Sequence, residues 1–94
     1  MEFTVPTTTG FTVYSKTGCS YCEKVKALLT EYQQEFTYIN CDEYLLFDRD
    51  AFLEFIRRIS GKDYKTFPMV FSSKTFLGGY TETFRLMLDT LIDK

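Results

Sequence analysis

The alternation of apolar and polar positions along the chain predicts four short strands. In each of them, β-branched and aromatic residues alternate with polar ones or form a short apolar run bounded by turn-forming residues, which is typical of strands. The first strand places Phe11 and Val13 on one side and Thr12 and Tyr14 on the other. The predicted strands are residues 11–15, 36–40, 69–72 and 75–77.

Three further segments carry apolar residues three and four positions apart, which is the spacing of one helical face. The first helix is expected over about 20–32. The second is expected to be capped by Asp48 or Asp50 and to end at Gly61, and the third to begin at about Thr81. Asp42–Phe47 is expected to be a loop. The predicted inward-facing residues are Cys22, Val25, Leu28, Leu29 and Tyr32; Ala51, Phe52, Phe55, Ile56 and Ile59; and Phe84, Met87, Leu88, Leu91 and Ile92.

The order of these elements, β-α-β-α-β-β-α, predicts an α/β fold. A right-handed crossover pairs the first two strands in parallel, and the final hairpin adds antiparallel strands. The economical packing is a four-stranded mixed sheet with the three helices distributed over both faces. With 94 residues, we expect a single domain over 1–94 that begins with a polar lead-in over 1–10.

The charge balance excludes several classes of function. The chain carries 13 acidic and 11 basic residues, so its formal charge of −2 argues against binding of nucleic acid or of an anionic membrane. No apolar run is long enough for a bilayer, and the first ten residues have no leader pattern, so we expect a cytoplasmic protein. The absence of His removes the commonest general base and the commonest zinc ligand.

Three cysteines are present, and two of them, Cys19 and Cys22, form a C-x-x-C motif. An odd count makes a poor disulfide framework, and three Cys without His are too few for a structural zinc site, so no metal is predicted. This leaves a redox pair as the favoured interpretation over simple packing. Cys41, at the end of the second strand, is expected to be a small buried hydrophobe rather than a regulatory thiol.

The position of the motif assigns different tasks to its two thiols. Cys19 comes just before a helix, where free N–H groups and the helix dipole favour a thiolate, and Lys16 adds a nearby cation. Cys22 follows one helical turn later, within reach of a mixed disulfide on Cys19. Cys19 is therefore the predicted nucleophile, with a lowered pKa, and Cys22 the shielded resolving thiol.

Three short motifs occur in order along the chain: Thr17-Gly18-Cys19-Ser20-Tyr21-Cys22, Thr66-Phe67-Pro68 and Gly78-Gly79-Tyr80-Thr81-Glu82. Together they resemble the glutaredoxin family in order and spacing, from about Phe11 to the end of the chain. The resemblance implies a thioredoxin fold in which Pro68 forms a cis bond facing the cysteines. It also implies glutathione as the reductant, with no tightly bound cofactor.

The same resemblance implies where glutathione binds. The cations Lys16 and Lys65 would border the glycine carboxylate together with Tyr21, and the Phe67 backbone would pair with the cysteinyl unit. Thr81 and Glu82 would hold the γ-glutamyl end. The expected glutathione-binding residues are Lys16, Tyr21, Lys65, Thr66, Phe67, Pro68, Gly79, Tyr80, Thr81 and Glu82.

The chain departs from the family pattern at three positions. Ser20 replaces the Pro of C-P-Y-C, which alters the start of the helix and the redox potential. Phe67 replaces the usual Val and makes the groove bulkier. Leu53 stands where many members place a Gln that contacts glutathione, so that contact is not expected here.

The predicted function is that of an enzyme, a glutathione-dependent thiol–disulfide oxidoreductase that acts on protein disulfides and glutathionyl mixed disulfides. It is expected to work as a monomer in electron transport and cell redox homeostasis, with ribonucleotide reductase among its candidate partners. One alternative is a dimer that binds a 2Fe–2S cluster through Cys19 and glutathione thiols. The other is a thioredoxin-like protein reduced by a flavoprotein reductase, against which the missing Trp and the Gly78-Gly79 pair argue.

Overall fold

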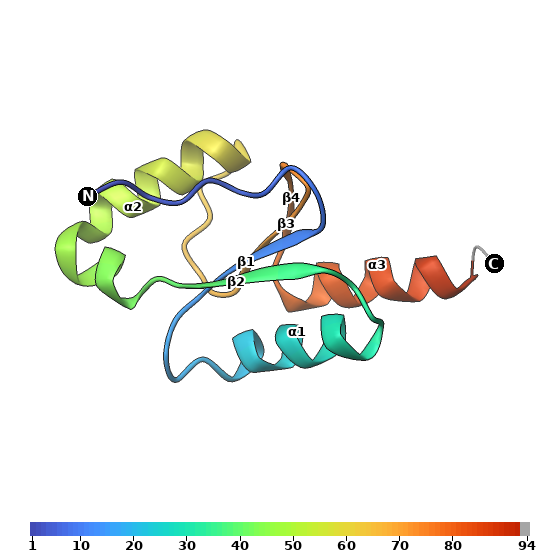
Figure 1. Ribbon diagram of the computed structural model, residues 1–94. Helices are drawn as coiled ribbons and strands as arrows, with labels where there is room; N and C mark the ends of the chain where they lie inside the picture. The colour runs from blue at the N-terminus through green and yellow to red at the C-terminus, as the bar shows by residue number, and fades with distance from the viewer. Residues whose placement is uncertain (93–94) are drawn as a thin grey trace.

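The strands form a mixed four-stranded sheet that lies between two helical layers (Figure 1). The structure is a computed structural model that describes residues 1–92. The strand order is β2-β1-β3-β4, in which β1 pairs with β2 in parallel and with β3 antiparallel, and β3 and β4 form an antiparallel hairpin. The strands are β1 (Phe11–Ser15), β2 (Phe36–Asn40), β3 (Met69–Ser72) and β4 (Thr75–Gly78). The predicted α/β class and strand directions are confirmed.

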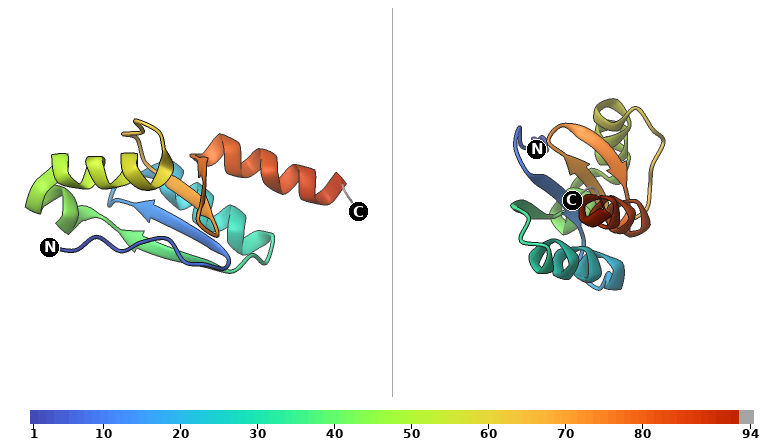
Figure 2. Two further views of the ribbon diagram at one scale, coloured as in Figure 1. Left: turned by 90° about the horizontal axis from the view of Figure 1, so that it is seen from above. Right: turned by 90° about the vertical axis from the view of Figure 1, so that its right-hand side faces the viewer.

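Helices cover both faces of the sheet, as Figure 2 shows from two sides. On one face, α1 (Ser20–Glu31) and α3 (Tyr80–Ile92) pack over a cluster that includes Phe11 and Val13. On the other face, α2 (Asp42–Ser60) packs over a cluster rich in aromatic residues that includes Tyr14. All five residues of β1 are buried, because this central strand has helices on both sides.

The helical segment α2 begins earlier than the sequence analysis predicts. Asp42–Phe47 is helical rather than a loop, since two acidic residues in its first turn complement the helix dipole. The helix is kinked at Asp48, whose φ of −164° and ψ of 93° are not helical. The Asp48 carboxylate accepts the Ala51 N–H at 3.0 Å and so caps the second half, as predicted. Gly61 ends the helix in the left-handed conformation with φ 74°.

The buried face of α3 also differs from the prediction. Phe84 and Leu88 are 38% and 39% exposed, whereas Thr83 and Met87 are buried. The Thr83 hydroxyl donates to the Gly79 carbonyl at 2.9 Å, so its polar group has a partner within the helix and the residue can be buried. The inward positions predicted for Leu91 and Ile92 lie outside the described side chains.

The first ten residues, the predicted polar lead-in, pack against the rest of the chain. They form no regular element, but the Phe3 ring packs against Tyr44, Phe52 and Phe55 with centroids 5.0 to 5.5 Å away. The Tyr14 hydroxyl donates to the Thr4 carbonyl at 2.5 Å. This segment therefore closes the aromatic cluster beneath α2. Among the helices of residues 1–92, none is both apolar and long enough to cross a bilayer.

Candidate active site

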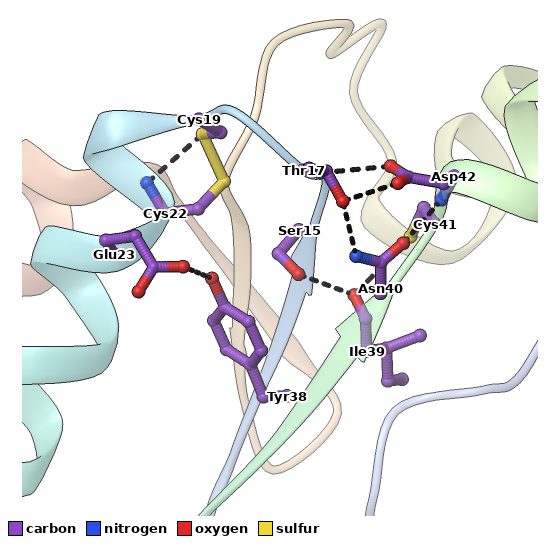
Figure 3. The surroundings of a disulfide bond; sticks show 10 residues. All are labelled: Ser15, Thr17, Cys19, Cys22, Glu23, Tyr38, Ile39, Asn40, Cys41 and Asp42. Carbon is purple, nitrogen blue, oxygen red and sulfur yellow. Dashed lines mark hydrogen bonds between the residues drawn. A yellow bond between two sulfur atoms is a disulfide. The ribbon is translucent and has the colours of Figure 1, made fainter.

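The C-x-x-C pair lies at the start of α1, beyond the carboxyl end of β1 (Figure 3). Cys19 is the N-cap of this helix, and its Sγ accepts the Cys22 N–H at 3.1 Å. The two sulfurs form a disulfide with the Cα atoms 5.2 Å apart. Cys22 is fully buried, whereas Cys19 is only half-buried. An attacking thiolate from solvent can therefore reach Cys19 but not Cys22.

The turn that leads into Cys19 is tied to the start of α2. The Asp42 carboxylate accepts two hydrogen bonds from Thr17, from the backbone N–H at 3.0 Å and from the hydroxyl at 2.5 Å. Asn40 donates to the same hydroxyl at 3.2 Å (Figure 3). The two hydrogen bonds from Thr17, and more weakly the charge of Lys16, hold the pKa of Asp42 below its usual value. Gly18 supplies the positive φ, 76°, that the turn needs before Cys19.

The loop before β3 also has the predicted conformation. The Phe67–Pro68 peptide bond is cis, and Pro68 is buried. The Phe67 ring stacks on Phe52 with centroids 6.2 Å apart. The Nζ atom of Lys16 lies 5.5 Å from the centroid of the Phe67 ring, a cation–π arrangement. The turn before Cys19 and the proline loop are thus in direct contact.

A groove of about 290 Å³ opens beside Tyr21, which lies between the two cysteines in sequence. Its walls come from α1, the proline loop and the start of α3. Seven of the predicted glutathione-binding residues line it, together with Tyr64, which the sequence analysis did not single out. The lining residues are Tyr21, Tyr64, Phe67, Pro68, Gly79, Tyr80, Thr81 and Glu82.

The remaining three predicted residues do not line the groove. Lys16 lies over the Phe67 ring, Lys65 forms an exposed ion pair with Asp63 at 3.9 Å, and Thr66 is exposed. Tyr64 lies outside all three motifs, so no motif predicts its place in the groove. The one feature of the sequence that could have pointed to it is that an aromatic residue stands two positions before Thr66.

The groove ends at the first turn of α3, where two side chains fix the backbone. The Glu82 carboxylate accepts the Gly79 N–H at 2.8 Å, which caps the helix. Gly78 has a φ of 134°, and a Cβ there would lie 2.7 Å from Glu82 Oε1. Gly78 is therefore required for the Glu82 carboxylate to reach the Gly79 N–H.

Cys41 lies outside this groove and is fully buried. Burial raises the pKa of its thiol to about 12, so it stays protonated at neutral pH. This confirms its interpretation as a packed hydrophobe. Within residues 1–92, no group of three His, Cys, Asp or Glu side chains is placed to hold a metal ion.

Comparison with known proteins identifies relatives of the chain. Residues 11–77 match the family model described as Glutaredoxin. The chain is 34% identical to human "Glutaredoxin-2, mitochondrial" over 79% of its own length and 43% of that protein. It therefore spans less than half of that relative. It is also 32% identical to "Glutaredoxin 1" of Rickettsia conorii, over 87% of this chain and 76% of the relative.

Solved structures agree with this grouping. A buckwheat glutaredoxin–glutathione complex superposes with a TM-score of 0.70 and 29% identity, over 85% of this chain and 69% of that one. Oxidized glutaredoxin 2 from Chlamydomonas reinhardtii gives a TM-score of 0.67 and 30% identity, over 88% and 75%. The sheet order and the three helices are those of a thioredoxin fold. The chain belongs to the glutaredoxin family.

Proposed function

We propose that this protein is a glutathione-dependent thiol–disulfide oxidoreductase that acts on protein disulfides and glutathionyl mixed disulfides. The observation that carries this proposal is the unequal exposure of two bonded sulfurs at a helix start, near a groove of about 290 Å³ that Tyr21 lines. The buckwheat relative, solved as a glutathione complex, supports glutathione as the ligand.

The chemistry follows from the geometry of the pair. In the dithiol form, the Cys19 thiolate attacks a substrate sulfur, forms a mixed disulfide and expels the other sulfur as a thiolate. Cys22 then loses its proton and attacks Cys19 Sγ, which releases the reduced substrate and leaves the Cys19–Cys22 disulfide. Two glutathione molecules reduce this disulfide in turn and leave as oxidised glutathione. When the substrate is a glutathionyl mixed disulfide, free glutathione can replace Cys22 in the second step.

In this proposal, the parts of glutathione lie in the groove and along the turn beside it. The Phe67 backbone would pair with the cysteinyl unit beside Cys19, while Thr81 and Glu82 would hold the γ-glutamyl end at the start of α3. The first amides of that helix have no acceptor within it, which favours a carboxylate there. Lys16 would face the glycine carboxylate from its position over the Phe67 ring.

The test is the electron source. The purified protein is given a disulfide substrate with either glutathione plus glutathione reductase or thioredoxin reductase alone, and NADPH consumption is followed. We expect turnover with glutathione and none with thioredoxin reductase. Turnover with thioredoxin reductase alone would favour the thioredoxin-like alternative and contradict the proposal.

A further inference from the structure

Part of the apolar stripe of α3 remains on the surface, although its spacing is that of a buried face. Phe84 and Leu88 are 38% and 39% exposed and lie one helical turn apart. Tyr80 precedes Phe84 by one more turn, and the two rings stack with centroids 5.9 Å apart. These three residues form a row of large apolar side chains along α3, which begins at the groove beside Tyr21 because Tyr80 also lines that groove.

A second groove, which we call the helix groove, lies between α3 and α1. The two helices pack against each other and begin at the same end of the molecule (Figure 1). The helix groove has a volume of about 410 Å³, whereas the groove beside Tyr21 has about 290 Å³. The first two residues of the row on α3 belong to its walls. Its apolar and charged lining residues include Lys24, Leu28, Glu31, Tyr32, Tyr80 and Phe84.

The helix groove is joined to the active site through two tyrosines. Tyr80 lines both grooves, and its ring lies 5.7 Å from the ring of Tyr21, measured between the centroids. Tyr21 stands between Cys19 and Cys22 in the sequence and is 53% exposed. A chain bonded to Cys19 can therefore pass over Tyr21 and Tyr80 into the helix groove.

The helix groove has the length of a short extended peptide. Tyr21 and Glu31 lie near opposite ends of α1, about 15 Å apart along the helix axis at about 1.5 Å per residue. An extended chain covers this distance with about four to five residues, since each residue advances about 3.3 Å. In the proposed function, the tripeptide glutathione occupies the groove beside Tyr21, so the helix groove is left for a longer chain, that of a protein substrate.

Two charges line the helix groove in a defined order from Cys19. The Nζ atom of Lys24 lies over the Tyr21 ring, 4.7 Å from its centroid, and is therefore near the cysteines. Glu31 is exposed at the other end of α1, and Leu28 lies between the two charged residues on this helix. A peptide is complementary to this order if an acidic residue near its cysteine is followed by an apolar residue and then by a basic one.

We propose that the helix groove is a docking site for the protein substrate, which places there the extended segment next to the cysteine that bonds to Cys19. The segment carries an apolar residue about three to four positions from that cysteine and a basic residue just beyond it. This inference rests on the proposed function, because disulfide exchange at Cys19 is what brings such a segment to the helix groove. It predicts that the protein selects among protein substrates by residues beyond the reacting cysteine.

Peptides that are closed by one disulfide and extended by a five-residue tail test this proposal. One tail carries Asp, Phe and Lys at its first, fourth and fifth positions, counted from the cysteine, and the other carries Ser at all three. Each tail precedes the first cysteine in one pair of peptides and follows the second cysteine in another pair. Reduction by glutathione with glutathione reductase is followed through NADPH consumption. In one of the two pairs, the tail with Phe should give a KM about five-fold lower, because the helix groove removes an apolar side chain from water.

Three variants connect this ratio of KM values to the helix groove. Phe84→Ser should abolish the ratio, because it removes the apolar wall. Glu31→Lys should lower the ratio about two-fold, because it repels the basic residue of the tail, and Glu31 is exposed, so the core is not disturbed. Leu46→Ser is the matched control, since Leu46 is 87% exposed and lines neither groove; it should leave the ratio unchanged.

Equal KM values for both tails in the wild type would overturn the inference, and so would a ratio that survives undiminished in Phe84→Ser or, should that variant not fold, in Glu31→Lys. An equal rise of KM for both tails in Phe84→Ser would reveal a structural role and overturn it as well. A wild-type dimer that Phe84→Ser separates, as seen by light scattering, would show that the helix groove is an interface between copies of the chain. In each of these cases, turnover of the peptides with glutathione leaves the proposed function intact. A wild-type protein that turns over none of the peptides with glutathione would overturn the proposed function, and the inference with it.

Discussion

The sulfur atoms of Cys19 and Cys22 differ in how far solvent can reach them, and this difference predicts how their variants behave. Cys22→Ser removes only the buried resolving thiol, so reduction of glutathionyl mixed disulfides should persist while reduction of protein disulfides is lost. Cys19→Ser should lose both activities. Initial rates on a glutathionylated peptide and on a protein disulfide measure this separation. Equal loss of both activities in Cys22→Ser would contradict the division of tasks.

Lys16 is the basic residue of the turn that precedes Cys19. Lys16→Gln should raise KM for a glutathionylated substrate several-fold, because a local charge and not the acidic chain as a whole attracts the anionic tripeptide. It should also slow alkylation of Cys19 by iodoacetamide at neutral pH. Lys26→Gln is the control, since its Nζ lies over the Tyr38 ring at 4.9 Å, outside the groove. Identical effects of the two variants would exclude a local role for Lys16.

At this scale, motif residues could be predicted from the sequence and residues outside motifs could not. The helix start at the thiol pair depends on neighbouring residues, whereas the cis bond at Pro68 was expected only from the resemblance to the glutaredoxin family. The role of Glu82 as the cap of α3 was not predicted. Tyr64 reaches the groove only because the sheet places Phe76 beneath it. Such a contact between distant segments leaves no periodic or local signal in the sequence.

Among the elements, the junction between β2 and α2 supports the turn that carries Cys19. Asp42 has a lowered pKa in the folded protein, so it stabilises the fold above its unfolded pKa of about 3.9 and loses this effect as the pH falls further. Asp42→Ala should therefore lower the melting temperature at pH 7, and the difference from wild type should shrink at pH 3. Glu43→Ala, at the exposed neighbouring position, is the control. A difference that persists at pH 3 would show that the charge is not its source.

The N-terminal segment should contribute to stability through Phe3. A buried Phe replaced by Ala typically costs 3–5 kcal/mol, and Phe3 is half-buried, so Phe3→Ala should cost about 2 kcal/mol of unfolding free energy. Val5→Ala, at a side chain that is 53% exposed, should change it by less than about 0.5 kcal/mol. Urea unfolding measures both. A cost for Phe3→Ala as small as the control's would show that the segment is not part of the core.

Element positions were predictable where periodicity and caps agree, as in α1 and at Asp48 and Gly61. The face of α3 was not, because Phe84 and Leu88 fit an apolar stripe that a buried Thr83 displaces. Burial of Thr83 is possible because its hydroxyl bonds to the Gly79 carbonyl, and hydrophobic spacing does not report such a satisfied polar position.

For the molecule as a whole, the connection rules were sufficient to predict the parallel pair β1–β2 and the hairpin β3–β4. They did not predict that β1 is central, with β2 and β3 as its neighbours, because that order depends on how the hairpin docks against the first pair. Helices then cover both faces, and the chain runs from the carboxyl end of the central strand β1 to the start of α1 (Figure 1). The monomeric state stays a prediction, to be checked by light scattering.

The most direct measurement of the central claim is the site at which glutathione attaches. Cys22→Ser is incubated with oxidised glutathione at neutral pH, and its intact mass and peptide map are recorded. One glutathione on Cys19 is predicted, with none on Cys41, whose buried thiol stays protonated. Cys19→Ser, treated identically, should carry none. An adduct on Cys41, or no adduct on Cys19, would contradict the account of Cys19 as the thiol that exchanges with glutathione.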